Sequence, residues 1–160
     1  MIEFNNMPTQ GEARRPKWVS GRAVIDMSIR KGRSIHIAGV THGKAPSPMG
    51  ARVGGMVFSA GLLGKDPATD TLPAGAAEQA RFLFQNLRTF LGNAGATMAD
   101  VVHVTAHVKD NSVRDPLNAE WVASFPDPDD RPARHTHVSP DLPGAVLVQL
   151  EIVAVVQEVR

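Results

Sequence analysis

The amino-acid sequence predicts an α+β domain, a mixed β-sheet with two helices packed on one face. Three observations carry this prediction: several segments with a two-residue hydrophobic period, two segments with a helical period, and their order along the chain, β-β-α-β-α-β-β. Two helices cannot cover both faces of a sheet of five or six strands, so one face stays uncovered. Such a face is polar, closed on itself or buried in an oligomer, which makes a homo-oligomer an expectation.

Length and composition exclude several classes of protein. The chain has 160 residues, a formal net charge of +1 and no cysteine. Without cysteine there is no disulfide, thiolate nucleophile or Cys-ligated metal, and a reducing, cytoplasmic setting is expected. No apolar run approaches the ~20 residues of a membrane span, so no membrane partner is expected. A net charge so close to zero argues against a dedicated nucleic-acid-binding protein.

The beginning of the chain differs from the rest. We expect residues 1–45 to form an N-terminal extension and residues 46–160 to form the domain. Residues 1–33 hold seven Lys and Arg against three acidic residues. The favoured interpretation is a solvated arm or an arm docked on a neighbouring subunit, and the alternative is a contact with RNA or an acidic partner.

The first strands are short. Alternating apolar and polar residues predict an extended piece at 34–40. The Gly54-Gly55 pair predicts a tight hairpin turn, which needs positive φ, between strands at 51–53 and 56–60. The stretch 61–73 is expected to be a turn-rich loop.

Two segments have the period of an amphipathic helix. Apolar residues recur at three- and four-residue intervals over 74–94, and Gly95 follows where a left-handed C-cap favours glycine. The second helix is expected over 113–125, ending before Pro126. Its buried face is predicted to consist of Val113, Leu117, Trp121, Val122 and Phe125.

The remaining strands are expected at 101–109, 133–138 and 146–156. In the first of these, four apolar side chains alternate with His103, Thr105 and His107; the apolar set is Val102, Val104, Ala106 and Val108. His135 and His137 share one face of the second strand. No third ligand stands at a metal-binding spacing, so surface or interface histidines are the favoured interpretation.

Polar residues in the last two strands point to a site. Gln149 and Glu151 lie next to each other on a strand face that is otherwise apolar, where a carboxylate needs a partner. Arg134 and Thr136 share a face of the preceding strand. One interpretation is a pocket in which the forked donors of Arg134 bind a small carboxylic acid. The other, which spacing alone slightly favours, is a structural ion pair between Arg134 and Glu151 in an oligomer interface.

Short segments spread over about Val53–Val156 resemble, in order and spacing, the RidA/YjgF family of imine deaminases, also known as the L-PSP endoribonuclease family. They include Met56–Gly61, Asp66–Thr69, Gln79–Arg81, Ala94–Ala96, Asp100–Thr105, Lys109-Asp110, Leu117-Asn118, Arg131–Arg134 and Val148–Glu151. The resemblance implies a chorismate-mutase-like fold and a homotrimer with clefts between subunits. It implies neither a metal nor a cofactor.

The resemblance also implies an activity, the hydrolysis of small 2-imino or enamino acids to 2-keto acids and ammonia. Arg134 matches the residue that holds the substrate carboxylate, while Gln149 stands at the position of the water-orienting glutamate. A pocket serine is replaced by Ala60, and the family's tyrosine is absent because the chain has none. Together with the strand pattern, this hypothesis gives a catalytic set of Arg134, Gln149 and Glu151. The substrate-binding set is Arg134, Thr136, Asn118, Gly61 and Leu62.

Because Gln149 stands at the position of the family's glutamate, more than one function is compatible with the sequence. A glutamine side chain can hold a water molecule but cannot accept its proton near neutral pH. Besides a deaminase, the chain is therefore compatible with a non-catalytic protein that binds small carboxylates. RNA binding or cleavage, suggested by the basic segment, is the third and least favoured hypothesis.

Overall fold

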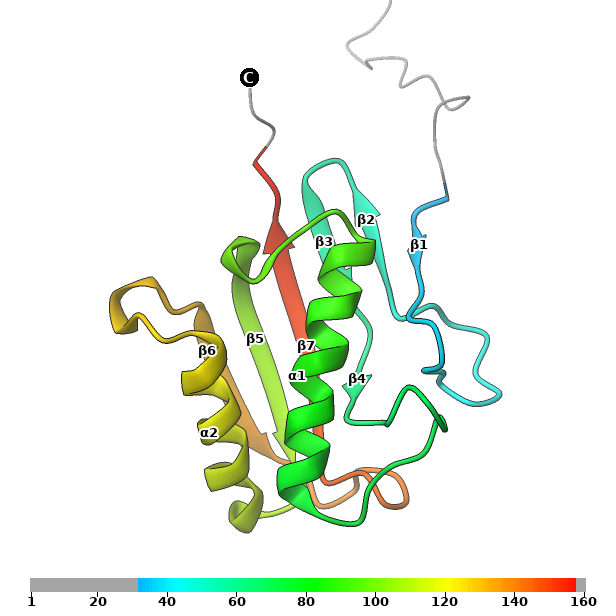
Figure 1. Cartoon of the computed structure of the whole chain (residues 1–160), viewed down its shortest axis with the longest axis vertical. Coiled ribbons are helices and arrows are strands. Elements are labelled where there is room, and N and C mark those ends of the chain that lie inside the picture. Colours follow the sequence, from blue (N-terminus) through cyan, green and yellow to red (C-terminus); the bar gives the residue numbers. More distant parts are fainter. Residues whose placement is uncertain (1–31, 158–160) are drawn as a thin grey trace, which may run out of the picture. The chain divides into compact units, whose positions relative to one another are not determined.

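A mixed β-sheet with two helices on one face forms the part of the chain that the structure, a computed structural model, describes, residues 32–157 (Figure 1). The strand order is β1-β2-β3-β7-β5-β6, and β4 also pairs with β7. All pairs are antiparallel except β5 with β6. The elements are β1 Ser34–Ile35, β2 Gly50–Val53, β3 Met56–Ser59, β4 Leu62–Leu63, α1 Ala76–Asn93, β5 Val101–Val108, α2 Arg114–Ser124, β6 Ala133–Val138 and β7 Val148–Val155. The predicted fold class is confirmed.

The core lies between the helices and the covered face of the sheet. The apolar stripe of α1 is buried there, including Leu83, Phe84, Leu87 and Phe90 with no exposed surface. Each such side chain contributes roughly 1.5–3 kcal/mol through burial. Gly95 follows α1 with φ +68°, the left-handed conformation that the sequence predicts.

The register of the central strand β5 with β6 and β7 determines on which face of the sheet the side chains of these two strands lie. Val104 lies opposite Arg134 on β6 and Ile152 on β7. Directly paired residues point to the same face of a sheet. Since Val104 is fully buried and Ile152 is 2% exposed, Arg134 projects toward the helices.

The next residues in register face the other way. His107 lies opposite His137 on β6 and Gln149 on β7, and the rings of His107 and His137 stack with centroids 5.4 Å apart. Glu151 lies two residues from Gln149 and shares its face. This open face of the sheet therefore carries the histidines, Gln149 and Glu151.

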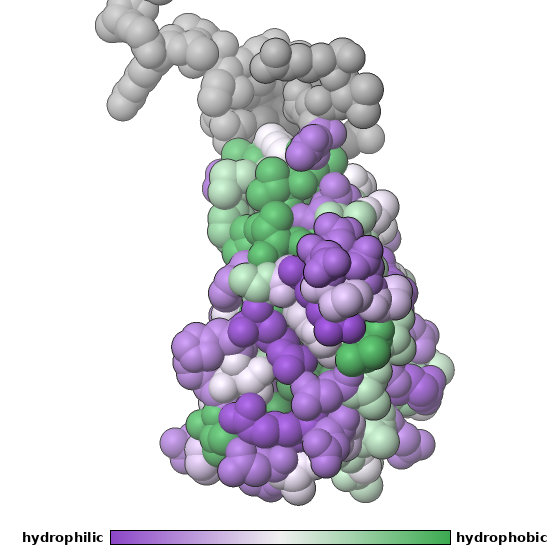
Figure 2. Space-filling view, turned by 90° about the vertical axis from the view of Figure 1, so that its left-hand side faces the viewer, coloured by the Kyte–Doolittle hydropathy of each residue, from purple (hydrophilic) through white to green (hydrophobic). Residues whose placement is uncertain are grey.

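The open face also carries apolar side chains. Met56 pairs with Val155 and Phe58 with Val153, in continuation of the Gln149 row. Met56 and Phe58 are each 47% exposed, and Val155 is 40% exposed. Figure 2 shows one side of the molecule, on which hydrophobic residues gather toward one end and hydrophilic residues dominate the other.

Three local expectations were wrong. A register shift between Val101 and His103 turns Val102 outward, so its side chain is 47% exposed instead of joining the apolar face. Val122 on α2 is 50% exposed rather than buried. The expected loop 61–73 contains the two-residue strand β4.

The residues just before the expected domain boundary belong to the same sheet. Strand β1 pairs with β2, and Ile35, Ile37 and Val40 are buried in the core although they fall in the expected extension. Most of the basic segment 1–33 lies outside the described residues. None of the helices described is long and apolar enough to cross a membrane.

Candidate functional site

Arg134 is held in place by two residues of α2. Its Nη2 donates a hydrogen bond to Asn118 Oδ1 at 2.7 Å, and its guanidinium lies over the Trp121 ring, 4.6 Å from the centroid. Trp121 in turn packs on Phe125, with ring centroids 4.6 Å apart. The sequence predicts Arg134 and Asn118 as site residues, and the structure brings them together.

One nitrogen of Arg134 lacks a partner. Nη1 is buried and makes no hydrogen bond with the described residues. A buried donor left in this state costs about 1–3 kcal/mol, more when it is charged. Burial lowers the pKa of Arg134, and the nearby charge of Arg114 lowers it further. An anion bound at Nη1 would offset both effects.

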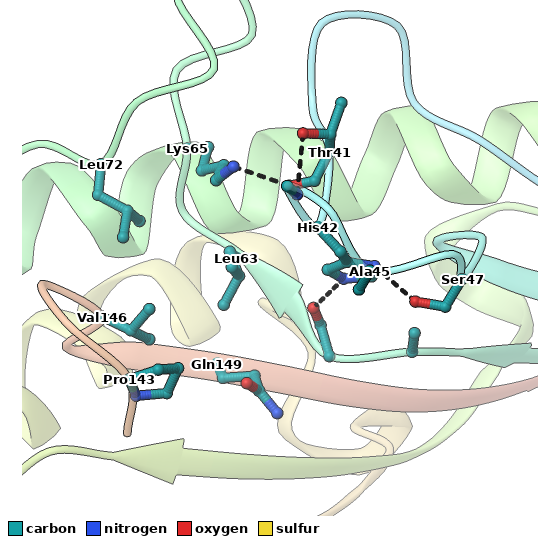
Figure 3. Close-up of a pocket in the computed structure, with 13 residues that line it drawn as sticks. Thr41, His42, Ala45, Ser47, Leu63, Lys65, Leu72, Pro143, Val146 and Gln149 are labelled. Carbon is teal, nitrogen blue, oxygen red and sulfur yellow. Dashed lines mark hydrogen bonds between the residues drawn. The ribbon is translucent and has the colours of Figure 1, made fainter. Parts of the chain in front are cut away.

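A second group of predicted residues lines a cavity of ≈ 520 Å³ on another part of the molecule. Gln149 lies on one side of this cavity, and His42 and Ser47 from the loop before β2 lie across from it (Figure 3). Gly61 lines the cavity, but the side chain of Leu62 is fully buried in the core, and Leu63 takes the lining position instead.

His42 connects two walls of the cavity. Its Nε2 lies 2.9 Å from the carbonyl oxygen of Gly61, and its Nδ1 lies 3.5 Å from Ser47 Oγ. Because a carbonyl oxygen only accepts, Nε2 carries a proton and donates it to Gly61. The His42 ring therefore fixes the loop that faces Gln149.

Lys65, also on the cavity wall, has its charge balanced within the chain. Its Nζ donates to the Thr41 carbonyl at 2.7 Å and to Asp70 Oδ1 at 2.9 Å. Burial would raise the pKa of Asp70, but hydrogen bonds from Thr41 and Lys65, together with the lysine charge, lower it to about 2. This cluster holds the loop around residue 41 against the residues after β4.

The side chain of Gln149 is positioned from two sides. Its amide rests on Gly61, where a Cβ would lie 2.6 Å from the amide carbon and nitrogen. Its Nε2 donates to Glu151 Oε1 at 3.4 Å. The carboxylate thus orients the amide, and the two side chains that the sequence pairs on one strand do contact each other.

The structure does not bring Arg134 to Gln149 and Glu151 within one chain. Strand β5 separates β6 from β7, and Arg134 faces the helices while the other two face the open side. The last two strands, β6 and β7, are therefore not neighbours in the sheet, and an ion pair between Arg134 and Glu151 does not form within the described chain. Thr136 accompanies Arg134 on the helix side.

Sequence reasoning missed Trp121, Arg114, His42 and Lys65 as site neighbours. The helical spacing of Trp121 predicts a core position and gives no sign of the guanidinium above its ring. His42 and Lys65 lie in loops, where no periodicity shows what a side chain faces. The only sequence signal near His42 is a group of polar residues followed by two closely spaced prolines, Pro46 and Pro48.

Comparison with known proteins agrees with this architecture. Residues 44–156 match the family described as Endoribonuclease L-PSP. The chain is 35% identical over 117 residues to a RutC family protein of Aquifex aeolicus, covering 70% of this chain and 94% of that protein. It is 32% identical over 111 residues to the 2-iminobutanoate/2-iminopropanoate deaminase of Escherichia coli, covering 69% and 87% respectively.

A solved structure shares the fold. The crystal structure of RidA from an Antarctic Psychrobacter species superposes with a TM-score of 0.71 at 28% identity, covering 78% of this chain and all of that one. The family match over residues 44–156 contains Arg134, Asn118, Trp121, Gly61 and Gln149, whereas His42 lies just before it. On these grounds the chain belongs to the RidA/YjgF family, also known as the endoribonuclease L-PSP family.

Proposed function

We propose that the protein is a hydrolytic deaminase of small 2-imino or enamino acids, with Arg134 as the anchor for the substrate carboxylate. The observation that carries the proposal is the buried Nη1 of Arg134, which has no hydrogen-bond partner among residues 32–157 although Asn118 and Trp121 hold its guanidinium rigidly. Carboxylates are the anions that match such a fork of donors. The similarity to a named imine deaminase supports the same reaction class.

A complete site on this proposal requires more than one copy of the chain. Arg134 and Gln149 face opposite sides of the sheet, so one molecule cannot present both to one small substrate. A homotrimer solves this by placing Arg134 of one copy at the Gln149 cavity of the next. The exposed Met56 and Phe58 on the open face supply apolar surface for the assembly.

The proposed reaction is the hydrolysis of the C=N bond and consumes one water molecule. Water adds to the carbon of the C=N bond, its oxygen stays on that carbon as the keto group, and the nitrogen leaves as ammonia with the hydrogens of water. Arg134 fixes the neighbouring carboxylate, which sets the position of the imine carbon. Gln149, oriented by Glu151 and Gly61, holds the attacking water by hydrogen bonds.

The experiment compares arginine variants on an imino acid made in situ by an amino-acid oxidase, with semicarbazide as the competing trap. Wild-type protein should divert the imine to keto acid and ammonia before the trap reacts. Arg134→Ala should lower kcat/KM at least a hundredfold, because a charge-assisted pair contributes about 1.5–3 kcal/mol and its loss also frees the substrate to rotate.

A matched control variant shows whether a loss of activity is specific to Arg134 or follows from the removal of any arginine side chain. Arg81 also stacks on an aromatic ring, with Cζ 4.1 Å from the centroid of Phe82, but lies exposed on α1. Arg81→Ala should retain wild-type kinetics. Equal rates for wild type and Arg134→Ala would refute the proposal.

The second candidate function is a non-catalytic protein that binds small carboxylates, and Gln149 is the observation that favours it. An amide cannot take the proton of the attacking water. On this hypothesis 2-keto acids stabilise the protein against heat without any turnover. Gln149→Glu should then create imine hydrolysis that the wild type lacks, whereas a deaminase should show activity before the substitution.

A further inference from the structure

The anchoring arginine has a second guanidinium beside it. Arg114 is the first residue of α2, and Asn118, which binds Arg134, lies four residues later on the same side of the helix. The charge of Arg114 acts on Arg134 strongly enough to lower its pKa in addition to the effect of burial. Two cations therefore face one region at the junction of α2 and β6.

Neither cation is neutralised within the described residues. Arg114 uses only its Nε, which donates to Asn111 Oδ1 at 2.9 Å, and Arg134 uses only its Nη2. The single salt bridge within the described range 32–157 joins Lys65 to Asp70, and neither residue belongs to α2 or β6. Asp115, the acidic residue next to Arg114 in the first turn of α2, is exposed and pairs with neither arginine.

Such an arrangement is unfavourable without an anion. Two like charges repel, and the partly buried Arg134 also lacks the solvation of an exposed side chain. One carboxylate can accept hydrogen bonds from the guanidinium group of one arginine, but it leaves the second arginine without an anionic partner. A ligand with two carboxylates satisfies both, and Asn118, whose Oδ1 is taken by Arg134, still offers its NH₂ group as a donor.

We propose that the site takes dicarboxylic 2-imino acids, with Arg134 binding the carboxylate next to the imine and Arg114 binding the distal carboxylate. This inference rests on the proposed function and narrows its substrate class. The Nη donors of Arg114 and the NH₂ group of Asn118 would bind the distal carboxylate, and the site would therefore favour substrates that carry one. A monocarboxylic acid of the same length fills the same space but leaves Arg114 unpaired.

The test uses two substrates that differ only in the distal group. An amino-acid oxidase converts glutamate or norvaline to five-carbon imino acids with two carboxylates or one. Wild-type kcat/KM should be about tenfold or more higher for the dicarboxylic imino acid than for the monocarboxylic one, the value of one charge-assisted pair.

Three variants test whether Arg114 causes this preference. Arg114→Gln should reduce the ratio of the two kcat/KM values to near one, and Arg114→Lys should restore much of it. Arg81→Gln, on an exposed arginine of α1, should leave the ratio unchanged.

Binding of the matched keto acids, 2-oxoglutarate and 2-oxopentanoate, gives a second readout by calorimetry. A tenfold preference for 2-oxoglutarate that Arg114→Gln abolishes supports the inference. Hydrolysis of both substrates at equal kcat/KM, or a preference that survives Arg114→Gln, overturns it and leaves the proposed function standing. A protein that neither binds nor hydrolyses any of the four compounds overturns both. An oligomer that dissociates on Arg114→Gln also overturns the inference, because Arg114 would then pair with an acid of a second copy.

Discussion

The amide of Gln149 rests directly on the backbone of Gly61, so closely that a Cβ at Gly61 would lie 2.6 Å from it. Gly61→Ala should therefore displace the amide and lower imine hydrolysis about tenfold, the scale expected when a positioning contact is lost. Stability should change little, because the atoms that must move belong to the end of a flexible side chain. Activity assays and thermal melts of the same sample check this expectation.

Gly92 on α1 provides the matched control. No atom lies within 4 Å of a Cβ built there, and its backbone is helical. Gly92→Ala should stabilise the protein by about 0.5–1 kcal/mol and leave activity unchanged. Unchanged activity in Gly61→Ala as well would show that the position of Gln149 does not matter for the reaction.

Asn118→Asp should abolish carboxylate binding more completely than Asn118→Ala. The aspartate is nearly isosteric and places a negative charge 2.7 Å from Arg134 Nη2, where it competes with the substrate for the guanidinium. The alanine variant only removes the bond that positions Arg134. Calorimetric titration with 2-keto acids should show weaker binding by about tenfold for alanine and no measurable binding for aspartate. The reverse order would contradict the anchoring role of Arg134.

Phe58→Asp should break the assembly and the activity together. Phe58 is 47% exposed on the open face, next to Val153 of β7, and a carboxylate there could be buried in an interface only at a cost of several kcal/mol. Sedimentation velocity should show monomers that hydrolyse no imine. Gln85→Asp on the exposed side of α1 is the control and should stay assembled. Monomers with full activity would refute the shared site.

Asp70 should contribute stability that disappears in acid. Its pKa is lowered from 3.8 to about 2 in the folded state, so the contribution is complete above about pH 4 and is lost as the pH falls through 2. Asp70→Asn keeps a residue that tolerates the φ of +54°. The melting-temperature gap between wild type and Asp70→Asn should narrow from pH 5 to pH 2. A constant gap would contradict the pKa shift.

The regular elements could be predicted because their hydrophobic periods are long. The stripe of α1 and the alternation of β7 each repeat over eight or more residues, and both predictions are confirmed. Strand β4 could not be found this way, since two residues carry no period. The outward turn of Val102 comes from a bulge, which shifts the alternation by one residue without any sign in the sequence.

The candidate site could be predicted only in pieces. Strand alternation correctly places Arg134 with Thr136, and Gln149 with Glu151. Which face each pair occupies depends on the register with β5, a tertiary property that neither strand encodes alone. The stacking of Arg134 on Trp121 depends likewise on how α2 lies across β6.

The opposite orientations of Arg134 and Gln149 have a consequence for mixed assemblies. In the proposed assembly each reaction centre takes its arginine from one protomer and its glutamine from another, so two separately inactive variants can complement each other. A mixture of Arg134→Ala chains with chains defective at residue 149 contains some pairings in which both intact side chains meet, and these should recover a fraction of the turnover. In such a protein, a harmful allele at one position is partly masked by a different harmful allele at the other.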